Sequence, residues 1–352
     1  MYPALEKDNE MDIKLIMKPI FSLFFLCGID LNEPRRKSSL IFSVFFNTIC
    51  LGIILSRILC LIGKPDWFVL ITTMIKISYL LLWWIANLRK KYLLKLIEDL
   101  ESLKSELDVR DYAKLLRTSK LAVTAAFLFI FIDSGLRIYN SIKRNELTFC
   151  LDYFSITLSP IIALIYEISV SYMQTSISYA IFAFYTTYCK TVAVCLQEKE
   201  RSKFEAHQIY STVLGIFRYL EETFSAIMVI IFGYISAAFL KNILDIVNDV
   251  KKGHYALVGT PSLNFVWNVL LASVIVLSAE KVQQRANDVR QSLFMMPRED
   301  FQCCSGKYMK ILEDREHLKL TVWGTVAVKK SLLLSLMVWN FTFGVVAIQC
   351  QG

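Results

Sequence analysis

The chain has 352 residues, of which 55% are hydrophobic and 20% charged, and its mean hydropathy is +0.47. An ordinary soluble domain is less apolar, so the composition argues against one and predicts a membrane protein. The formal net charge of +8 does not indicate a nucleic-acid partner, because Lys and Arg on cytoplasmic loops account for it. The nine cysteines form no CxxC pair, so no metal or cofactor is expected.

Seven apolar runs follow one another along the chain. A helix needs about 20 mostly apolar residues to cross the ~30 Å hydrocarbon core of a bilayer. The runs are 40–62, 67–88, 121–139, 148–170, 223–247, 263–279 and 331–350. They are continuous, whereas barrel strands alternate apolar and polar residues. The sequence therefore predicts an all-α polytopic membrane protein with seven transmembrane helices, behind an N-terminal segment (1–39) whose apolar part, 20–27, is too short to span.

The fourth run is the ambiguous one, because apolar character continues through 172–196. Neither Gly nor Pro interrupts the chain between Pro160 and residue 196, so the sequence has no chemistry for a turn back across the bilayer. We expect one long helix that continues into the cytosol, with a kink near Pro160. The region 89–120 carries leucines at helical spacing and is expected to extend the second helix or begin the third.

The lysines and arginines predict the direction of insertion. Most of the 39 fall in the N-terminal segment and in the regions after the second, fourth and sixth runs. The opposite side receives Lys64, Lys143, Arg144, Lys251 and Lys252. Because positive loops stay in the cytoplasm, the N-terminus is expected inside the cell and the C-terminus outside. A G-protein-coupled receptor has the opposite topology.

Charged residues inside the runs are candidates for function, because each is costly in hydrocarbon unless it is paired or hydrated. Asp133 and Arg137 are four residues apart, as are Lys241 and Asp245, so each pair shares one helix face. By the predicted topology both pairs fall in outer halves of the membrane. They form internal ion pairs or line a wet ligand vestibule, and Glu167 is a further partner for either.

Aromatic and amide side chains are expected at a similar depth. They are Trp67, Tyr79, Tyr153, Tyr166, Tyr234, Asn264, Trp267 and Asn268. Such a mixture suits a small-molecule pocket, although Trp67 and Trp267 also fit an interfacial belt. Trp83 and Trp84, near the inner end of the second run, are expected in that belt. Arg57 and Lys76 are expected to snorkel to an interface or to face the same cavity.

The last run ends in Thr342-Phe343, a five-residue spacer and Gln349-Cys350. This ending resembles the seventh helix of insect gustatory receptors, which carries Thr-Tyr, five apolar residues and Gln-Phe. Phe343 is a conservative replacement of the tyrosine, and Cys350 departs from the family phenylalanine. The motif covers about the last 30 residues, while seven runs and an inside N-terminus fit along the whole chain.

The resemblance implies a ligand-gated, non-selective cation channel in the plasma membrane, permeable to monovalent cations and calcium. Family members assemble as tetramers, homomeric or heteromeric, around a pore lined by the seventh helix (here 331–352). Residues 40–280 are then the ligand-binding transmembrane domain, and 281–330 the cytoplasmic anchor between subunits. The implied pore residues are Gln349, Val346, Val345, Ile348 and Thr342, with Gln349 as an outer polar ring and Val346 as an apolar gate. Gly344 allows close helix approach or a bend.

The resemblance also implies a small tastant, a bitter compound or a sugar, bound in the outer half of helices two to six. The ligand candidates are Trp67, Tyr79, Asp133, Arg137, Tyr153, Tyr166, Glu167, Lys241, Asn264, Trp267 and Asn268. Signatures of enzymes such as the P-loop, GxSxG and HExxH are absent from the sequence. The alternatives are an insect odorant-receptor-type channel subunit, a G-protein-coupled receptor or a small transporter.

Overall fold

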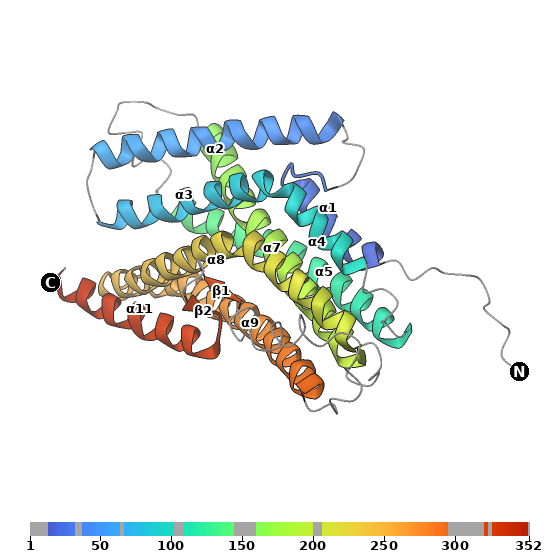
Figure 1. Cartoon of the computed structure of the whole chain (residues 1–352). Coiled ribbons are helices and arrows are strands. Elements are labelled where there is room, and N and C mark those ends of the chain that lie inside the picture. Colours follow the sequence, from blue (N-terminus) through green and yellow to red (C-terminus); the bar gives the residue numbers. More distant parts are fainter. Residues whose placement is uncertain are drawn as a thin grey trace, which may run out of the picture.

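The protein is a bundle of long helices that lie side by side (Figure 1). The computed structural model describes residues 13–31, 37–63, 67–101, 109–143, 160–199, 206–294, 320–322 and 326–350. Its helices are α1 (Ile13–Leu26), α2 (Lys37–Gly63), α3 (Trp67–Leu88), α4 (Lys90–Glu101), α5 (Val109–Lys143), α7 (Pro160–Lys199), α8 (Ala206–Lys251), α9 (Tyr255–Phe294) and α11 (Lys330–Cys350). The short strands β1 (Thr321–Val322) and β2 (Val326–Ala327) pair antiparallel just before α11.

Five of these helices are long and apolar enough to cross a membrane. The apolar windows are Val69–Leu88, Arg110–Leu136, Thr175–Leu196, Leu214–Lys251 and Leu257–Gln291. Two further helices carry shorter apolar windows, Leu40–Ser56 and Lys330–Val346. The prediction of an all-α protein with several membrane helices is confirmed, while the count of seven crossings and the direction of insertion stay predictions.

Helix α7 runs through the middle of the bundle and contacts α1, α2, α3, α5, α8 and α9. It continues unbroken from Pro160 to Lys199, so residues 172–196 do not turn back, as predicted. Its apolar window, Thr175–Leu196, lies after the predicted run 148–170, of which 148–159 fall outside the described residues. That window is 83% buried, because the apolar side chains there pack against neighbouring helices.

The N-terminal helix α1 was not predicted. One face of the helix and the residue after it are apolar and buried: Ile16, Met17, Ile20, Leu23, Phe24 and Cys27. The helix packs on α4, α5 and α7. The helix ends at Leu26. Two residues later, Gly28 has φ of +75° and lies so close to α2 that a Cβ there would be 2.9 Å from Ser43 N. Both the backbone angle and the contact therefore require glycine.

The polar segment after α3 forms a separate helix, α4, rather than an extension of α3 or a start of α5. A turn at Arg89 separates α3 from α4, and the Arg89 guanidinium donates to the Thr223 carbonyl of α8 at 3.1 Å. Leu93, Leu96, Ile97 and Leu100 of α4 are buried. The predicted leucine spacing is therefore a packing face of an independent helix.

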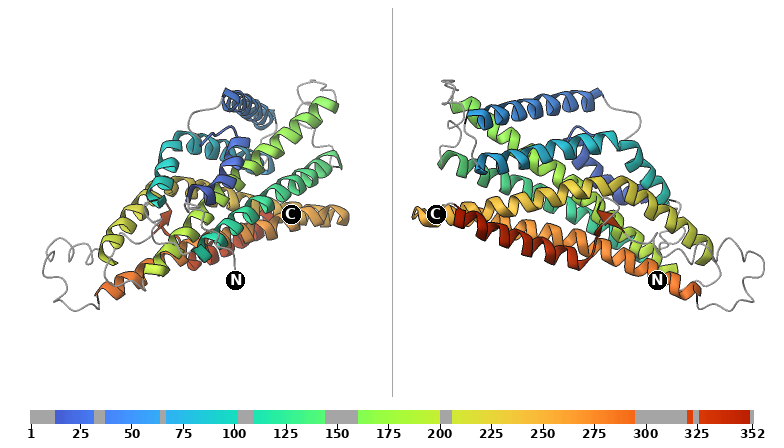
Figure 2. Two further views of the ribbon diagram at one scale, coloured as in Figure 1. Left: turned by 90° about the vertical axis from the view of Figure 1, so that its right-hand side faces the viewer. Right: turned by 60° about the vertical axis from the view of Figure 1, so that its left-hand side comes forward.

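Helix α11 lies along α8 and α9 at one side of the bundle (Figures 1 and 2). Its C-terminal end is at the same end of the bundle as the α8–α9 connection, and α1 and α4 lie toward the opposite end (Figure 1). The C-terminal part of α9 continues past the predicted sixth run and ends at Phe294. In this part Val282, Ala286 and Val289 are buried at helical spacing. This part of the predicted anchor segment is therefore an amphipathic helix.

Candidate ligand site and pore helix

An aromatic cluster joins α5, α7 and α9. The rings of Phe129 and Trp267 are nearly parallel, with centroids 3.3 Å apart and an interplanar angle of 13°. Tyr179 of α7 contacts both, at 5.9 Å from Phe129 and 6.0 Å from Trp267. Trp267 is therefore half-buried against α5 and α7, with its indole N–H enclosed by the protein, and its interpretation as a membrane-interface residue stays a prediction.

Polar atoms are buried on the same three helices. Trp267 Nε1, Ser134 Oγ and Ser178 Oγ are buried and have no hydrogen-bond partner among the described residues. Asp133, beside Ser134, is only 7% exposed. Buried polar groups are almost always hydrogen-bonded, so unsatisfied donors and acceptors on the three helices that carry the aromatic cluster are a feature expected of a site that receives a polar ligand.

A second network crosses α3, α8 and α9. The rings of Tyr79 and Tyr234 lie 4.7 Å apart, and the Tyr234 hydroxyl donates to Asn268 Oδ1 at 3.4 Å. Asn268 is one residue after Trp267, so α9 connects this network to the aromatic cluster. The two groups together form what we call the Tyr–Trp network: Tyr79, Phe129, Tyr179, Tyr234, Trp267 and Asn268.

The predicted ion pair of α8 is present. Lys241 Nζ lies 2.6 Å from Asp245 Oδ2, one helical turn away, and Asp245 is 4% exposed. The pair satisfies both charges within one helix, which is how a charged residue is tolerated among apolar neighbours. Its two partners are therefore held together rather than directed separately at a ligand.

One face of α11 is seated on α8. Asn340 is buried, donates to its own helix at Leu336 O over 2.7 Å and lies 3.5 Å from Ser236 Oγ of α8. Four residues later, a Cβ on Gly344 would lie 3.2 Å from Ile243 Cγ2. The predicted close approach at Gly344 is thus observed.

The opposite face of α11 is exposed in the single chain. Residues at spacings of three or four share a helix face, and the exposed stripe consists of Ser331, Ser335, Val338, Thr342, Val345, Val346 and Gln349. The stripe thus bears small, hydroxyl and amide side chains. Bulkier exposed residues flank it, including Trp339 and Phe343, whose rings lie 5.2 Å apart.

The start of α11 is also tied to its neighbours. Gln283 of α9 donates to Val328 O at 3.1 Å, and Lys330 lies 3.3 Å from Glu280. Thr321 of β1 donates to Glu221 of α8. Because the hairpin and the Asn340–Gly344 face hold α11 at two levels, the rotation of the helix about its axis is determined, and so is the face that points away.

Comparison with solved structures identifies the architecture. The insect olfactory receptor OR5 from Machilis hrabei matches with a TM-score of 0.68 at 13% sequence identity, over 97% of this chain and 100% of that one. The chain has the fold of an insect olfactory receptor. The same receptor in complex with eugenol matches with a TM-score of 0.69 at 12% identity, over 96% and 97% of the two chains. No protein-family model and no curated protein sequence matches.

The olfactory-receptor fold confirms the resemblance that the terminal motif predicted, at the level of the fold. It also brings several predicted ligand residues together. Tyr79, Trp267 and Asn268 join in the Tyr–Trp network, Asp133 lies buried on α5, and Asn264 is one turn from Asn268. Of the remaining candidates, Tyr153 and the side chains of Trp67, Arg137, Tyr166 and Glu167 lie outside the described residues, as do the side chains of Arg57 and Ile348.

Sequence reasoning missed Phe129 and Tyr179, because neither carries a charge or an amide that distinguishes it from a core residue. It also misplaced Trp83, which is 1% exposed and donates its indole N–H to Cys27 O at 2.7 Å. Trp83 is therefore a core residue that holds the end of α1 rather than a member of the interfacial belt. Trp84 is 38% exposed and remains compatible with that belt.

Proposed function

We propose that this protein is a chemosensory receptor of the gustatory type that acts as a ligand-gated, non-selective cation channel in the plasma membrane. The chain is one subunit of a homomeric or heteromeric tetramer, with its N-terminus in the cytoplasm. The observation that carries the proposal is the rotation of α11. Asn340 and Gly344 face α8, and this leaves Thr342, Val346 and Gln349 on the free face.

The free face has the chemistry of a pore wall. Four copies of α11 around one axis would place Gln349 amides in an outer ring, where they replace part of the hydration shell of an ion without selecting strongly by charge. Val345 and Val346, 48% and 47% exposed in the single chain, would form an apolar constriction that closes by dewetting. Ser331 and Ser335 extend the stripe toward the inner end with hydroxyl groups.

The Tyr–Trp network is our proposed receptor site. It combines stacked rings with the buried Trp267 Nε1, and the same helices carry Ser134 Oγ and Ser178 Oγ; these three atoms have no hydrogen-bond partner among the described residues. An aromatic or heterocyclic tastant with a few hydrogen-bonding groups, or a sugar, would satisfy these atoms. The network touches α9, and α9 in turn holds the start of α11 through Gln283 and Glu280. Ligand binding is thus connected to the pore helix through one continuous helix.

The test is expression in oocytes with a panel of bitter compounds and sugars, followed by Gln349→Ala and Val346→Ala. We expect Gln349→Ala to change relative cation permeability and Val346→Ala to increase current without ligand. If both variants keep wild-type permeability and gating, the pore assignment is wrong. Exchange of Phe341, which flanks the stripe, for alanine is the control.

A second candidate function is an olfactory receptor-type channel subunit. The fold match to OR5 from Machilis hrabei, including its complex with eugenol, favours it. A volatile phenol such as eugenol would use the same rings and buried donors. The ligand panel therefore includes volatile aromatics, and activation by these alone would favour the olfactory alternative over the gustatory one.

A further inference from the structure

The N-terminal part of α5 has a buried face and a basic face. Ser119 is fully buried and donates a hydrogen bond to Ile16 O of α1. Arg110, Lys114 and Arg117 lie at spacings of four and three residues, so they share one helix face, and all three are exposed. With 3.6 residues in each turn, this face lies opposite Ser119. Its charges are therefore directed away from α1 and out of the bundle.

A fourth exposed cation, Lys120, borders this face. We call the four residues the basic stripe: Arg110, Lys114, Arg117 and Lys120. Among the described residues, no ion pair involves any of the four. Between residues 109 and 120 the single acidic residue is Asp111, which lies off the stripe and is only partly exposed. The stripe is therefore a positively charged surface that is open to an anionic partner.

Beyond the basic stripe, the same face of α5 becomes apolar. Leu121, Leu128 and Ile132 continue the face from Arg117 at spacings of four, seven and four residues, and they are 70%, 57% and 45% exposed. No charged residue occurs from 121 to 132. An exposed apolar surface of this extent on a membrane helix suits the hydrocarbon of the bilayer. The change from basic to apolar at residues 120–121 therefore marks the edge of the hydrocarbon on α5.

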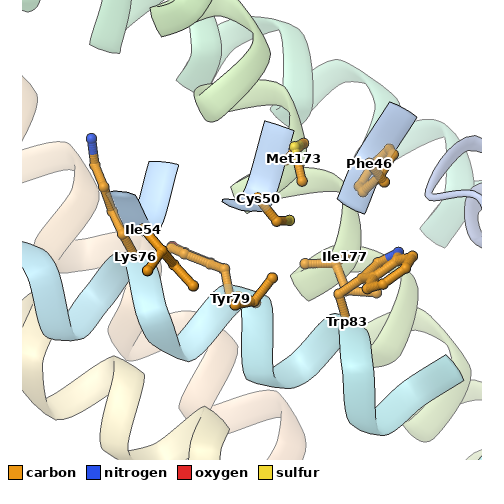
Figure 3. A pocket seen from close by; sticks show the side chains of 9 residues that line it. Phe46, Cys50, Ile54, Lys76, Tyr79, Trp83, Met173 and Ile177 are labelled. Atoms are coloured by element: carbon orange, nitrogen blue, oxygen red, sulfur yellow. The ribbon is translucent and has the colours of Figure 1, made fainter. Parts of the chain in front are cut away.

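Helix α3 changes from apolar to charged at a similar level. Its side chains from Tyr79 to Trp83 pack beside apolar side chains of α2 and α7 (Figure 3), and no charge follows until Arg89. Tyr79 and Phe129 both belong to the Tyr–Trp network. Arg89 lies ten residues from Tyr79 and Lys120 nine residues from Phe129, so each is about 13–15 Å along its helix from the network.

This end of α5 lies with α1 and α4. Ser119 contacts α1 at Ile16, and Lys14 of α1 lies 3.1 Å from Glu101 of α4. Helices α1 and α4 are toward the end of the bundle opposite to the C-terminus of α11 (Figure 1). The proposed function, on which the following inference rests for its orientation, puts that end in the cytoplasm. The cytoplasmic leaflet is the one that carries anionic lipids.

We propose that the basic stripe binds a phosphoinositide of the cytoplasmic leaflet that has at least two phosphates on its inositol ring. Four to eight Lys or Arg residues directly beside a membrane helix are typical of sites for such lipids. The acyl chains lie along the apolar face that begins at Leu121. The phosphates lie against Arg110, Lys114 and Arg117, and the arginines can each donate two parallel hydrogen bonds to a phosphate.

The length of the stripe distinguishes this lipid from simpler anionic lipids. From Lys120 to Arg110 the helix rises about 15 Å, whereas the headgroup layer of one leaflet is roughly 5–8 Å thick. The carboxylate and phosphate of phosphatidylserine stay within that layer and reach only Lys120 and Arg117. Phosphates on an inositol ring extend farther from the hydrocarbon, so they also reach Lys114 and Arg110.

The test is native mass spectrometry of the full chain in detergent, titrated with dioctanoyl phosphatidylinositol bisphosphate or dioctanoyl phosphatidylserine. Phosphatidylserine should bind about tenfold more weakly or worse, because it reaches two fewer cations. Lys114→Gln with Arg117→Gln should weaken binding of the bisphosphate about 30-fold, which is about fivefold for each cation. Lys281→Gln with Lys329→Gln removes the same charge from exposed lysines of α9 and of the residue before α11, and should bind like the wild-type chain.

Two further comparisons test the charge and the depth order. Lys114→Arg with Arg117→Lys keeps both charges and should keep most of the binding. Arg110→Gln should weaken binding of the bisphosphate more than that of phosphatidylinositol monophosphate, because Arg110 lies farthest from the hydrocarbon. Lys120→Gln, at the hydrocarbon edge, should weaken both lipids equally.

Soluble inositol trisphosphate separates a lipid site from a site for a free phosphate. It should compete at least about tenfold less well than the lipid, because it lacks the acyl chains. Equal competition, equal binding of phosphatidylserine, or an equal loss in the Lys281 and Lys329 variant would overturn the proposal. Binding requires no current, so its failure is distinct from failure of the channel function.

Discussion

Gly344 of α11 lies directly against Ile243 of α8: a Cβ on the glycine would be 3.2 Å from Ile243 Cγ2 and 3.3 Å from its Cδ1. Such distances are tighter than ordinary van der Waals contact, so α11 approaches α8 this closely only because residue 344 has no side chain. The contact fixes which face of α11 points away from its own subunit. The proposed pore depends on that face.

The first prediction concerns this contact. Gly344→Leu should destabilise the seating of α11 by about 1–3 kcal/mol, the usual cost of overpacking, and should reduce ligand-evoked current. In the double variant, Ile243→Ala should restore part of the lost stability and part of the lost current, because it makes room for the leucine. Thermal unfolding in detergent and oocyte currents measure the two effects. Gly233→Leu, at an exposed position of α8 with nothing within 4 Å of the added Cβ, is the control, and an equal loss there would contradict the explanation.

The second prediction concerns the Tyr–Trp network. Tyr234→Phe keeps the ring that contacts Tyr79 but removes the hydroxyl that bonds Asn268. We expect the half-maximal ligand concentration to rise about three- to tenfold, the equivalent of one hydrogen bond, with little change in maximal current. Trp267→Leu should have a larger effect, because it removes a stacked ring and a buried donor. Trp84→Leu serves as the control and should keep the wild-type dose response; the idea fails if Tyr234→Phe and Trp267→Leu keep it too.

The third prediction compares two glycines with positive φ. Gly28 and Gly253 have φ of 75° and 71°, so alanine at either position costs roughly 1 kcal/mol of backbone strain. At Gly28 the added Cβ also meets the α2 backbone at 2.9 Å, whereas at Gly253 nothing lies within 4 Å. Gly28→Ala should therefore lower the thermal midpoint far more than Gly253→Ala. Similar shifts for the two would mean that α1 is not locked against α2.

The membrane helices could be predicted from the sequence, whereas α1 and the contacts between helices could not. Long apolar runs identify membrane helices, because the bilayer imposes both length and composition. The same runs do not reveal α1, since a 14-residue helix gains its stability from burial against α5 and α7. Nor do they show that Trp267 stacks on Phe129, because ring pairing depends on how α5 and α9 approach. The terminal motif predicted α11 as the pore helix, but only the packing of Asn340 and Gly344 shows how α11 is oriented in the bundle.

The fourth prediction concerns Asp99 on α4. Burial raises the pKa of its carboxyl, with the nearby Lys95 acting in the opposite direction. A raised pKa means that the ionised carboxylate is less favourable in the folded state than in the unfolded state. Ionised Asp99 therefore lowers the free energy of unfolding above its ordinary pKa, and this cost disappears as the pH falls. Asp99→Asn should therefore raise the thermal midpoint at pH 7.5, by an amount that shrinks toward pH 4. A midpoint that falls at pH 7.5 would show that its attraction to Lys95 is the larger effect.

The most direct test of the central claim is cysteine accessibility along α11, on a Cys350→Ser background in channels opened by an active compound. A charged thiol reagent applied from outside should alter the current of Val338→Cys, Thr342→Cys and Val346→Cys, which lie on the free face. It should not alter that of Asn340→Cys or Gly344→Cys, which face α8. Equal reaction at both sets of positions, or reaction only at the second, would contradict a pore lined by this face of α11.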